Sequence, residues 1–407
     1  MRLDKRLLPI ILGESLEAYD FFLYGLLSVF IAKTFFTQDT ELALTFSFTL
    51  FSVAYIARPI GSIIWGHIAD KYGRKKVMLG TLSLMAVPAI GMALMPSYES
   101  IGVTATILVV LLRFLQGIAF GGESPTIIAS LYEMAPEDRK GLYGGLYNPG
   151  LLIGYLSGIV LVIILTKIIG NDGMESYGWR FLFAISLIFI ALLGYFRQRI
   201  IETSRLTHTA RLPFLDTIKK DWLAVVKIVL YLSCPTVMFY NLLFHNYLII
   251  NAAKFGVKTL FAQAIIVLFI IFMMPLFGFL TDKLGNKIKT VGTTYVLIFI
   301  SSVILYSLFL SEHLPTMIFG YFIFAILASV VCSTFPAISV PQTSKTCRVS
   351  TIGISLGLSA ISGSFIPAIN ELTKKLTDNP LSPAFIIMAC ALVSFLTLFC
   401  IKKEGIQ

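Results

Sequence analysis

Long apolar segments follow one another along the whole chain, each bounded by charged residues, glycine or proline. An apolar segment of about 20 residues is long enough to cross the roughly 30 Å hydrocarbon core of a bilayer as a helix. The pattern therefore predicts twelve membrane-spanning helices, near residues 8–33, 42–67, 77–96, 102–131, 142–168, 179–197, 223–252, 258–280, 289–311, 313–339, 349–372 and 382–401.

Two polar turns interrupt this pattern with the same spacing of glycine and aspartate. The first is residues 66–73 (GHIADKYG) and the second is residues 278–285 (GFLTDKLG). The two copies lie 212 residues apart in a chain of 407 residues. A repeat separated by about half the chain indicates a duplicated unit and therefore two similar halves.

The composition agrees with a membrane-embedded chain. Apolar residues make up 57% of the sequence and charged residues 13%, whereas soluble domains average roughly 45–50% and about 25%. The five cysteines lie in or beside apolar segments without metal-ligand spacing, so we expect buried side chains and no metal site. The N-terminal segment lacks a small-residue cleavage site, which indicates a first membrane helix and not a removed signal peptide.

Lysine and arginine are distributed unevenly among the links between the predicted helices. Of the 32 lysines and arginines, 22 lie in the termini and in the links after even-numbered helices, and this set includes Arg197 at the end of the sixth helix. Seven lie in the other links. The positive-inside rule then predicts that both termini and both turns lie in the cytoplasm. We expect a multi-pass protein of the bacterial inner membrane. The net charge of +10 reflects topology and contact with anionic lipid, so no nucleic-acid partner is expected.

The link after the sixth helix divides the chain. It runs from residue 198 to 222 and is too short to be a soluble domain. The predicted fold class is an all-α membrane protein with twelve helices in two pseudo-symmetric six-helix bundles. Residues 1–197 form the first bundle, 198–222 a cytoplasmic linker, and 223–407 the second bundle.

Five stretches carry a family resemblance. Residues 66–76 resemble the signature turn of the major facilitator superfamily, and residues 278–287 resemble its weaker second copy. Residues 13–25, 57–61 and 113–123 resemble the metabolite:proton symporter branch, which includes proline/betaine and organic-acid carriers. The resemblance implies the major facilitator fold and proton-coupled transport of a metabolite.

Polar residues of the first helix fall within one stripe: Glu14, Glu17, Asp20 and Tyr24. An ionised carboxylate at membrane depth costs about 2.5–3.5 kcal/mol on insertion scales, so several on one face indicate function. We predict that Glu17, Asp20 and Tyr24 bind substrate or couple protons. Glu14 stands where the resembled branch usually has a neutral polar residue, and Ala18 replaces its usual aromatic residue. Glu14 is either functional or solvated near the cytoplasmic end.

The fourth helix presents a complementary set on one face: Arg113, Gln116, Phe120 and Glu123. We predict all four as site residues, because a guanidinium can fork onto a substrate carboxylate or hold an acid of the first helix until substrate displaces it. A permanent structural ion pair is the alternative for Arg113.

The second and seventh helices supply further candidates. Arg58 precedes a proline, which predicts a kink whose arginine pairs with an acid of the first or fourth helix. Asn241 and His245 are predicted to face the opposite half across a central cavity, and histidine can carry a proton. A hydrogen-bonded strut is the alternative for His245. Tyr240 offers a face for a quaternary ammonium group, with plain packing as the alternative.

The first glycine–aspartate turn is predicted to act as a conformational latch. Gly66 and Gly73 permit a tight backbone, and Asp70 is expected to meet the positive N-terminal end of a partner helix. Arg74 is expected to meet a carboxylate or a lipid phosphate. Such contacts form only when the bundles close on the cytoplasmic side, so they stabilise the outward-facing state.

Two more residues are assigned to this latch. Arg139 is placed to join the network through Glu133 or Asp138, and Asp282 is the equivalent of Asp70 in the second half. Solvated topology charges are the alternative, which accounts for the lysines but not for the aspartates or the repeated spacing.

Together these features predict a symporter that imports a small organic solute, such as a zwitterionic osmolyte, an amino acid or a carboxylate, by alternating access. Its partners are the solute, protons and the lipid bilayer, its energy source is the proton gradient without a cofactor, and it is expected to work as a monomer.

No GxxxxGK[ST] loop and no HExxH motif occur in the sequence, so no enzyme is predicted. An exporter of drugs or siderophores, or a solute sensor on the same scaffold, is the alternative. Residues 148–150 (NPG) replace the glycine-rich pattern of such exporters and favour import.

Overall fold

The computed structural model describes residues 7–35, 40–198, 213–243 and 257–401. Within these residues every regular element is a helix. The first half contains α1 (Leu7–Leu26), α2 (Ser28–Phe35), α3 (Thr40–Tyr72), α4 (Arg74–Leu94), α5 (Tyr98–Ile101), α6 (Val103–Met134), η1 (Glu137–Arg139), α7 (Lys140–Gly144), α8 (Tyr147–Gly173), η2 (Met174–Gly178) and α9 (Trp179–Arg197). The second half contains α10 (Pro213–Lys220), α11 (Trp222–Leu243), α14 (Val257–Leu284), α15 (Lys287–Phe309), α16 (Leu314–Ser339), η3 (Val340–Gln342), α17 (Arg348–Ser364), α18 (Ile366–Thr377) and α19 (Ser382–Thr397).

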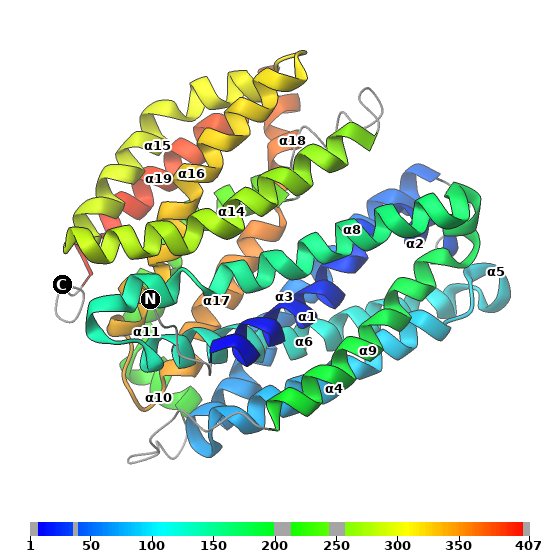
Figure 1. Ribbon diagram of the computed structural model, residues 1–407, viewed down its shortest axis with the longest axis horizontal. Coiled ribbons are helices and arrows are strands. Elements are labelled where there is room, and N and C mark those ends of the chain that lie inside the picture. Colours follow the sequence, from blue (N-terminus) through cyan, green and yellow to red (C-terminus); the bar gives the residue numbers. More distant parts are fainter. Residues whose placement is uncertain (1–6, 36–39, 199–212, 244–256, 402–407) are drawn as a thin grey trace.

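These helices form two bundles that lie side by side (Figure 1). Helices α1 to α9 make one bundle and α11 to α19 make the other, and the ribbons meet at one end and diverge toward the other. Each predicted membrane segment has a counterpart among the described helices, with α1 and α2 together forming the first and α17 and α18 together forming the eleventh. The predicted all-α, two-bundle fold class is confirmed. Of the predicted linker, α10 is described and residues 199–212 lie outside the described residues.

Membrane crossing is supported by length and composition. Eight helical stretches of the described chain are long and apolar enough to cross a membrane, and one of them, Glu137–Arg197, contains both α8 and α9. Helix α1 differs because it carries three acids, and α19 differs because it has 16 residues. Large apolar side chains such as Phe272 and Ile300 are exposed on the outside of the bundles, as lipid contact requires.

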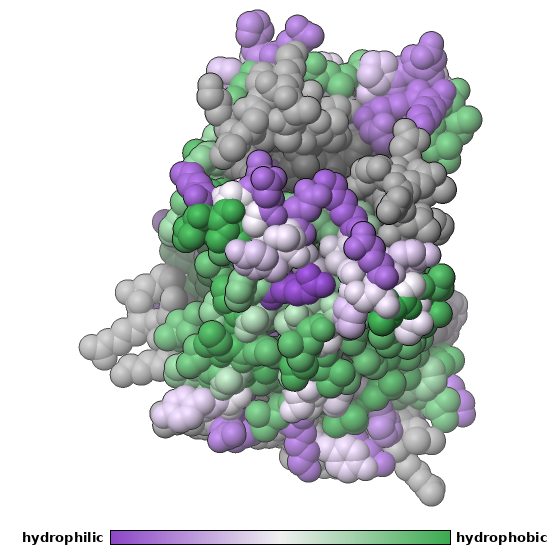
Figure 2. All heavy atoms as spheres, turned by 90° about the vertical axis from the view of Figure 1, so that its right-hand side faces the viewer, coloured by the Kyte–Doolittle hydropathy of each residue, from purple (hydrophilic) through white to green (hydrophobic). Residues whose placement is uncertain are grey.

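The two ends of the molecule differ. The turn end carries Gly73 and Gly285, whose φ angles of 100° and 72° are ones that glycine adopts without strain. The far end carries α2, α5 and α18. Figure 2 views this far end, where hydrophilic residues gather across the upper and middle parts and a hydrophobic band lies below them.

Close helix contacts fix the core of the first bundle. A Cβ atom at Gly117 or Gly121 of α6 would collide with the carbonyl oxygens of Ala54 and Arg58 on α3. Small residues allow membrane helices to approach in this way. The contact sets the rotation of α3 about its axis and therefore the direction in which Arg58 points.

Helix α17 of the second bundle packs on α3 of the first. A Cβ atom at Gly357 would lie 2.9 Å from Pro59, and one at Gly353 would lie 2.9 Å from Ser62. Residues 353–357 also have the Gly-x-Ser-x-Gly spacing of a hydrolase nucleophile, which requires a strand-to-helix turn. Here the run lies inside α17 and the Ser355 hydroxyl donates to the Thr351 carbonyl at 2.8 Å. These glycines therefore serve helix packing.

Candidate functional site

A cavity of roughly 100 Å³ lies between the two bundles. Its walls come from α3 and α8 of the first bundle and from α11, α16 and α17 of the second. Arg58 is the one charged side chain among its described lining residues, and four aromatic rings accompany it: Tyr147, Phe239, Tyr240 and Phe335. The cavity thus combines one cation with several ring faces.

Arg58 is half-buried, and its guanidinium group packs against aromatic rings. Its guanidinium carbon lies 4.8 Å from the centre of the Phe120 ring and 5.6 Å from that of Tyr55. Its Nε atom has no hydrogen-bond partner among the described residues. The expected ion pair with an acid of the first or fourth helix is not formed in the described part of the chain, so Arg58 has donor capacity left for a ligand.

The predicted residues Asp20, Gln116 and Arg113 form one chain of contacts between α1 and α6. The Gln116 amide nitrogen donates to the Asp20 carboxylate, and the Gln116 oxygen accepts from Arg113. Arg113 also donates to the Phe21 carbonyl at 3.3 Å and lies 4.3 Å from the centre of the Tyr24 ring. These side chains are buried within the first bundle, and none of them is among the residues that line the cavity.

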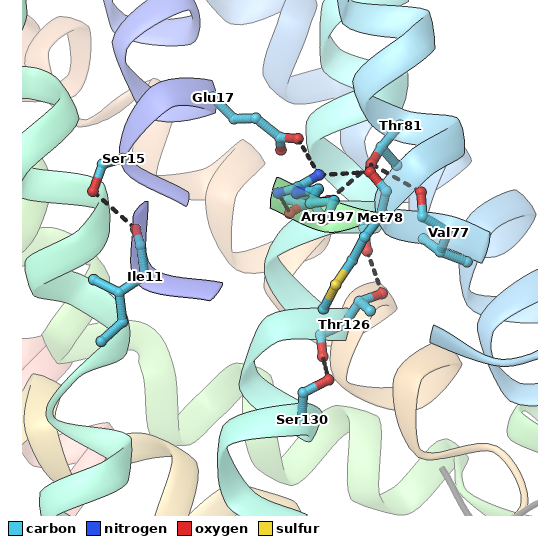
Figure 3. Close-up of polar contacts among 11 residues, drawn as sticks. Ile11, Ser15, Glu17, Val77, Met78, Thr81, Thr126, Ser130 and Arg197 are labelled. Atoms are coloured by element: carbon cyan, nitrogen blue, oxygen red, sulfur yellow. Dashed lines mark hydrogen bonds and ion pairs between the residues drawn. The ribbon is translucent and has the colours of Figure 1, made fainter. Parts of the chain in front are cut away.

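Glu17 and Glu123 share one cation, Arg197. Figure 3 shows Arg197 beside Glu17 and Met78. Arg197 donates from Nη1 to Glu17 Oε1 at 2.6 Å and to the Met78 carbonyl at 2.6 Å, and from Nη2 to Glu123. The second oxygen of Glu123 accepts from Thr81 at 2.8 Å. Arg197 and both acids are at most 1% exposed, so this is a buried cluster of one guanidinium and two carboxylates.

Arg197 is the functional candidate that sequence reasoning missed. Its position at the end of the sixth predicted helix grouped it with the cations of the following link, whereas its side chain lies buried inside the first bundle. The available signal was the pair of buried acids, since carboxylates inside a membrane protein are paired with cations. Arg197 is the last residue of α9, where a long side chain can still reach the bundle interior.

The remaining predicted site residues lie elsewhere. Asn241 is buried between α11 and α18, where it accepts from the Asn370 amide at 2.9 Å and donates to the Val237 carbonyl at 2.8 Å. Phe120 stacks on Phe21 with ring centres 4.3 Å apart. His245 lies outside the described residues.

Asp70 binds the N-terminus of α17, across the interface between the bundles. Its carboxylate accepts from the Val349 and Ser350 backbone amides at 3.0 and 2.9 Å and from the Ser350 hydroxyl at 2.8 Å. A Cβ atom at Gly66 would lie 2.9 Å from the Ser350 Cα. The contact with a partner-helix N-terminus is the one that the sequence predicts, and it places a negative charge at a positive helix end.

Asp282 of the second bundle makes the equivalent contact with a helix of the first bundle. Its two oxygens accept from the Gly141 and Leu142 amides of α7 at 2.8 and 2.7 Å. Lys287 lies 3.4 Å from the same carboxylate. Each turn therefore caps a helix of the other bundle by the same kind of contact.

Glu133 extends this interface at the turn end. It pairs with Arg74 at 2.6 Å and with Arg348 of the second bundle at 2.7 Å. Arg139 instead lies 3.5 Å from its neighbour Asp138, and its side chain is 43% exposed. The cation that joins Glu133 from across the interface is therefore Arg348.

Asp221 supports the same region from within the second half. It accepts from the Ser344 amide at 2.8 Å and hydroxyl at 2.6 Å, and from the Cys347 thiol at 3.4 Å. Burial, together with the nearby Asp221 charge, raises the pKa of Cys347 to about 11, so the thiol stays protonated and can donate. Asp221 therefore orders the loop that leads into the helix N-terminus bound by Asp70.

Known proteins are similar to this chain over most of its length. A family model described as Major Facilitator Superfamily matches residues 10–369. The citrate-proton symporter of Salmonella typhi is 28% identical over 95% of this chain and 91% of its own length. The proline/betaine transporter of Escherichia coli (strain K12) is 25% identical over 99% of this chain and 84% of its own length.

Solved structures show the same fold. A double-tryptophan variant of XylE superimposes with a TM-score of 0.74 at 16% identity, covering 98% of this chain and 95% of the other. The proton:xylose symporter XylE bound to 6-bromo-6-deoxy-D-glucose gives a TM-score of 0.71 at 16% identity, covering 96% and 93%. At such identities the likeness concerns the fold, and it agrees with the predicted two-bundle architecture.

Proposed function

The chain belongs to the major facilitator superfamily, and from this we propose that it is a proton-coupled symporter that imports a compact solute carrying one carboxylate. The relatives named as symporters and transporters support proton-coupled transport as the general activity. The observation that carries the choice of solute is the cavity between the bundles, in which Arg58 is the one described cation.

The lining favours a zwitterion over a multiply charged acid. A guanidinium binds a carboxylate through two parallel hydrogen bonds, and the ring faces of Tyr147, Phe239 and Tyr240 suit an alkylated ammonium group. A tricarboxylate would bring two further negative charges into a low-dielectric space without described cations to meet them. We therefore expect betaine-like or proline-like solutes to bind better than citrate.

The cavity favours a compact solute. A buried water requires about 10–15 Å³, so a cavity of roughly 100 Å³ has room for about seven to ten water-sized positions. This volume suits a small zwitterion such as proline or glycine betaine.

The proposal also assigns a conformational state to the structure. The proposal places the turn end in the cytoplasm of a bacterial cell, according to the distribution of lysine and arginine. Because Asp70 and Asp282 are bound at that end, we infer a state that is closed toward the cytoplasm. Release of both caps would let the bundles rock and expose the cavity on the cytoplasmic side. The cavity lies within one chain, so a monomer suffices.

Proteoliposome uptake tests this proposal. Radiolabelled L-proline, glycine betaine and citrate are presented with and without an inward proton gradient. We expect gradient-driven accumulation of at least one zwitterion and little uptake of citrate. Arg58→Lys should raise the half-saturating solute concentration about tenfold, because a lysine cannot form the bidentate pair. Arg180→Lys, which lies near η2 away from the cavity, is the control. Preferred uptake of citrate, or uptake that ignores the gradient, would contradict the proposal.

A further inference from the structure

Glu14 of α1 is a buried carboxylate without a hydrogen-bond partner. It is 1% exposed, and neither of its oxygens has a partner among the described residues. An ionised carboxylate in such a place lacks both water and donors, whereas a protonated one carries no charge and costs far less to bury.

Charged and titratable groups from five helices interact electrostatically with Glu14. Glu17 belongs to the same helix. The others are Arg58 of α3, Glu123 of α6, Tyr147 of α8 and Arg197 of α9.

The charges of this group do not balance. Three carboxylates, Glu14, Glu17 and Glu123, face two guanidinium groups, Arg58 and Arg197. Arg197 contacts Glu17 and Glu123 directly. Glu14 is the carboxylate that no described cation touches. A single proton on Glu14 would make the group neutral as a whole.

Glu14 is not itself a lining residue of the solute cavity, but it interacts electrostatically with two residues that are. Arg58 and Tyr147, two of the groups that face it, line the cavity. Helix α8 comes close to Glu14 because residue 150 is glycine, where a Cβ atom would lie 3.2 Å from the Glu14 Cβ. A charge bound at Arg58 is therefore felt at Glu14.

We propose that Glu14 is the residue that binds the transported proton, and that a solute carboxylate on Arg58 requires Glu14 to be protonated. This inference rests on the proposed function. With the cavity empty, the Arg58 charge partly offsets an ionised Glu14, so the carboxyl group can release its proton. When a solute carboxylate pairs with Arg58, the guanidinium charge no longer offsets the charge of Glu14. Glu14 therefore takes a proton from water on the side to which the cavity is open. After the bundles rock, solute and proton leave together on the other side, and Glu14 is ionised again. Asp20 and Glu123 do not fill this role, because Gln116 holds the first and Arg197 and Thr81 hold the second.

Infrared difference spectroscopy on purified protein in lipid tests the proton site without a solute. Spectra recorded between acidic and alkaline pH report the carbonyl band of a protonated, buried carboxyl group. We expect such a band in the wild-type protein and in Glu99→Gln, an exposed position with the same substitution. Glu14→Gln should lack it. A band of unchanged intensity in Glu14→Gln would overturn the assignment.

Transport by the same variants tests the coupling. With L-proline and glycine betaine as solutes, Glu14→Gln should lose gradient-driven accumulation at least tenfold and retain solute exchange at equal pH, because glutamine mimics the protonated acid. Glu14→Asp keeps a carboxyl group and should restore accumulation in part, which separates coupling from a folding defect. Wild-type accumulation in Glu14→Gln would refute Glu14 as the proton site and leave symport standing. Absence of accumulation by the wild-type protein would instead refute the proposed function, and the infrared band would still decide whether Glu14 binds a proton.

Discussion

Removal of Arg197 should destabilise the protein, because it leaves two buried carboxylates without their cation. The substitution Arg197→Met keeps much of the side-chain length and deletes the one cation that contacts Glu17 and Glu123. Loss of one partner from a buried ion pair costs about 3–5 kcal/mol, because the remaining charge is left without compensation. Here two carboxylates lose their partner, so the upper part of that range applies.

The expected shift in melting temperature follows from chain length. Unfolding entropy is about 2 cal/mol/K per residue, so for 407 residues that unfold as one unit the loss lowers the melting temperature by about 4–6 °C. Intrinsic fluorescence during heating of the purified protein in detergent measures this shift.

Two controls separate the buried charge from a general effect. Lys33→Met breaks a surface pair with Glu175, in which both side chains are 48% exposed, and should cost less than about 1 kcal/mol. Combining Arg197→Met with Glu17→Gln and Glu123→Gln removes the unpaired charges and should recover most of the lost stability. If Arg197→Met melts at the same temperature as Lys33→Met, the buried cluster does not have the energetic role assigned to it.

Further predictions concern the latch and the buried arginine of α6. Asp70→Asn and Asp282→Asn each weaken charge-assisted caps worth about 1.5–3 kcal/mol, so transport turnover should fall about tenfold or more while solute affinity stays near wild type. Exposed Asp172→Asn is the control, and unaltered turnover in both cap variants would contradict the latch. Arg113→Lys should leave the half-saturating solute concentration unchanged and lower the melting temperature, because Arg113 contacts Gln116 and ring faces inside the bundle. A tenfold loss of affinity in equilibrium binding would instead place Arg113 in the solute site.

The fold is accessible from the sequence because lipid imposes a simple rule. Every backbone group inside a bilayer must be paired within the segment, so each long apolar segment becomes a helix. The repeat at residues 66–73 and 278–285 indicates in addition that the chain consists of two similar halves. The Asp70 contact is also accessible, since a carboxylate at a tight turn beside a bundle interface has few partners other than a helix N-terminus.

The site is less accessible because it depends on helix rotation. Residues 113, 116 and 123 share one face of α6, yet that face meets α1 and α9 inside the bundle, and the cavity is reached by Arg58 of α3. Close packing at Gly117 and Gly121 decides this rotation, and the sequence does not say which helix a glycine will contact.

Ion-pair partners that lie far apart in the sequence are the second feature of the site that the sequence does not predict. Arg197 lies 180 residues from Glu17, and only the assembled bundle shows that it compensates two acids. Once Arg197 is placed, Glu14 emerges as the carboxylate in excess. The roles of the predicted site and latch residues in transport stay predictions until the variants are measured.

Solute-driven proton movement tests the central claim most directly. Proteoliposomes that contain the purified protein and a pH-sensitive dye start at equal pH inside and outside, and L-proline or glycine betaine is then added outside. Symport predicts that the interior becomes acidic as the solute enters, with no such change in Glu14→Gln. Alkalinisation of the interior, or solute entry without any change in pH, would contradict coupled import.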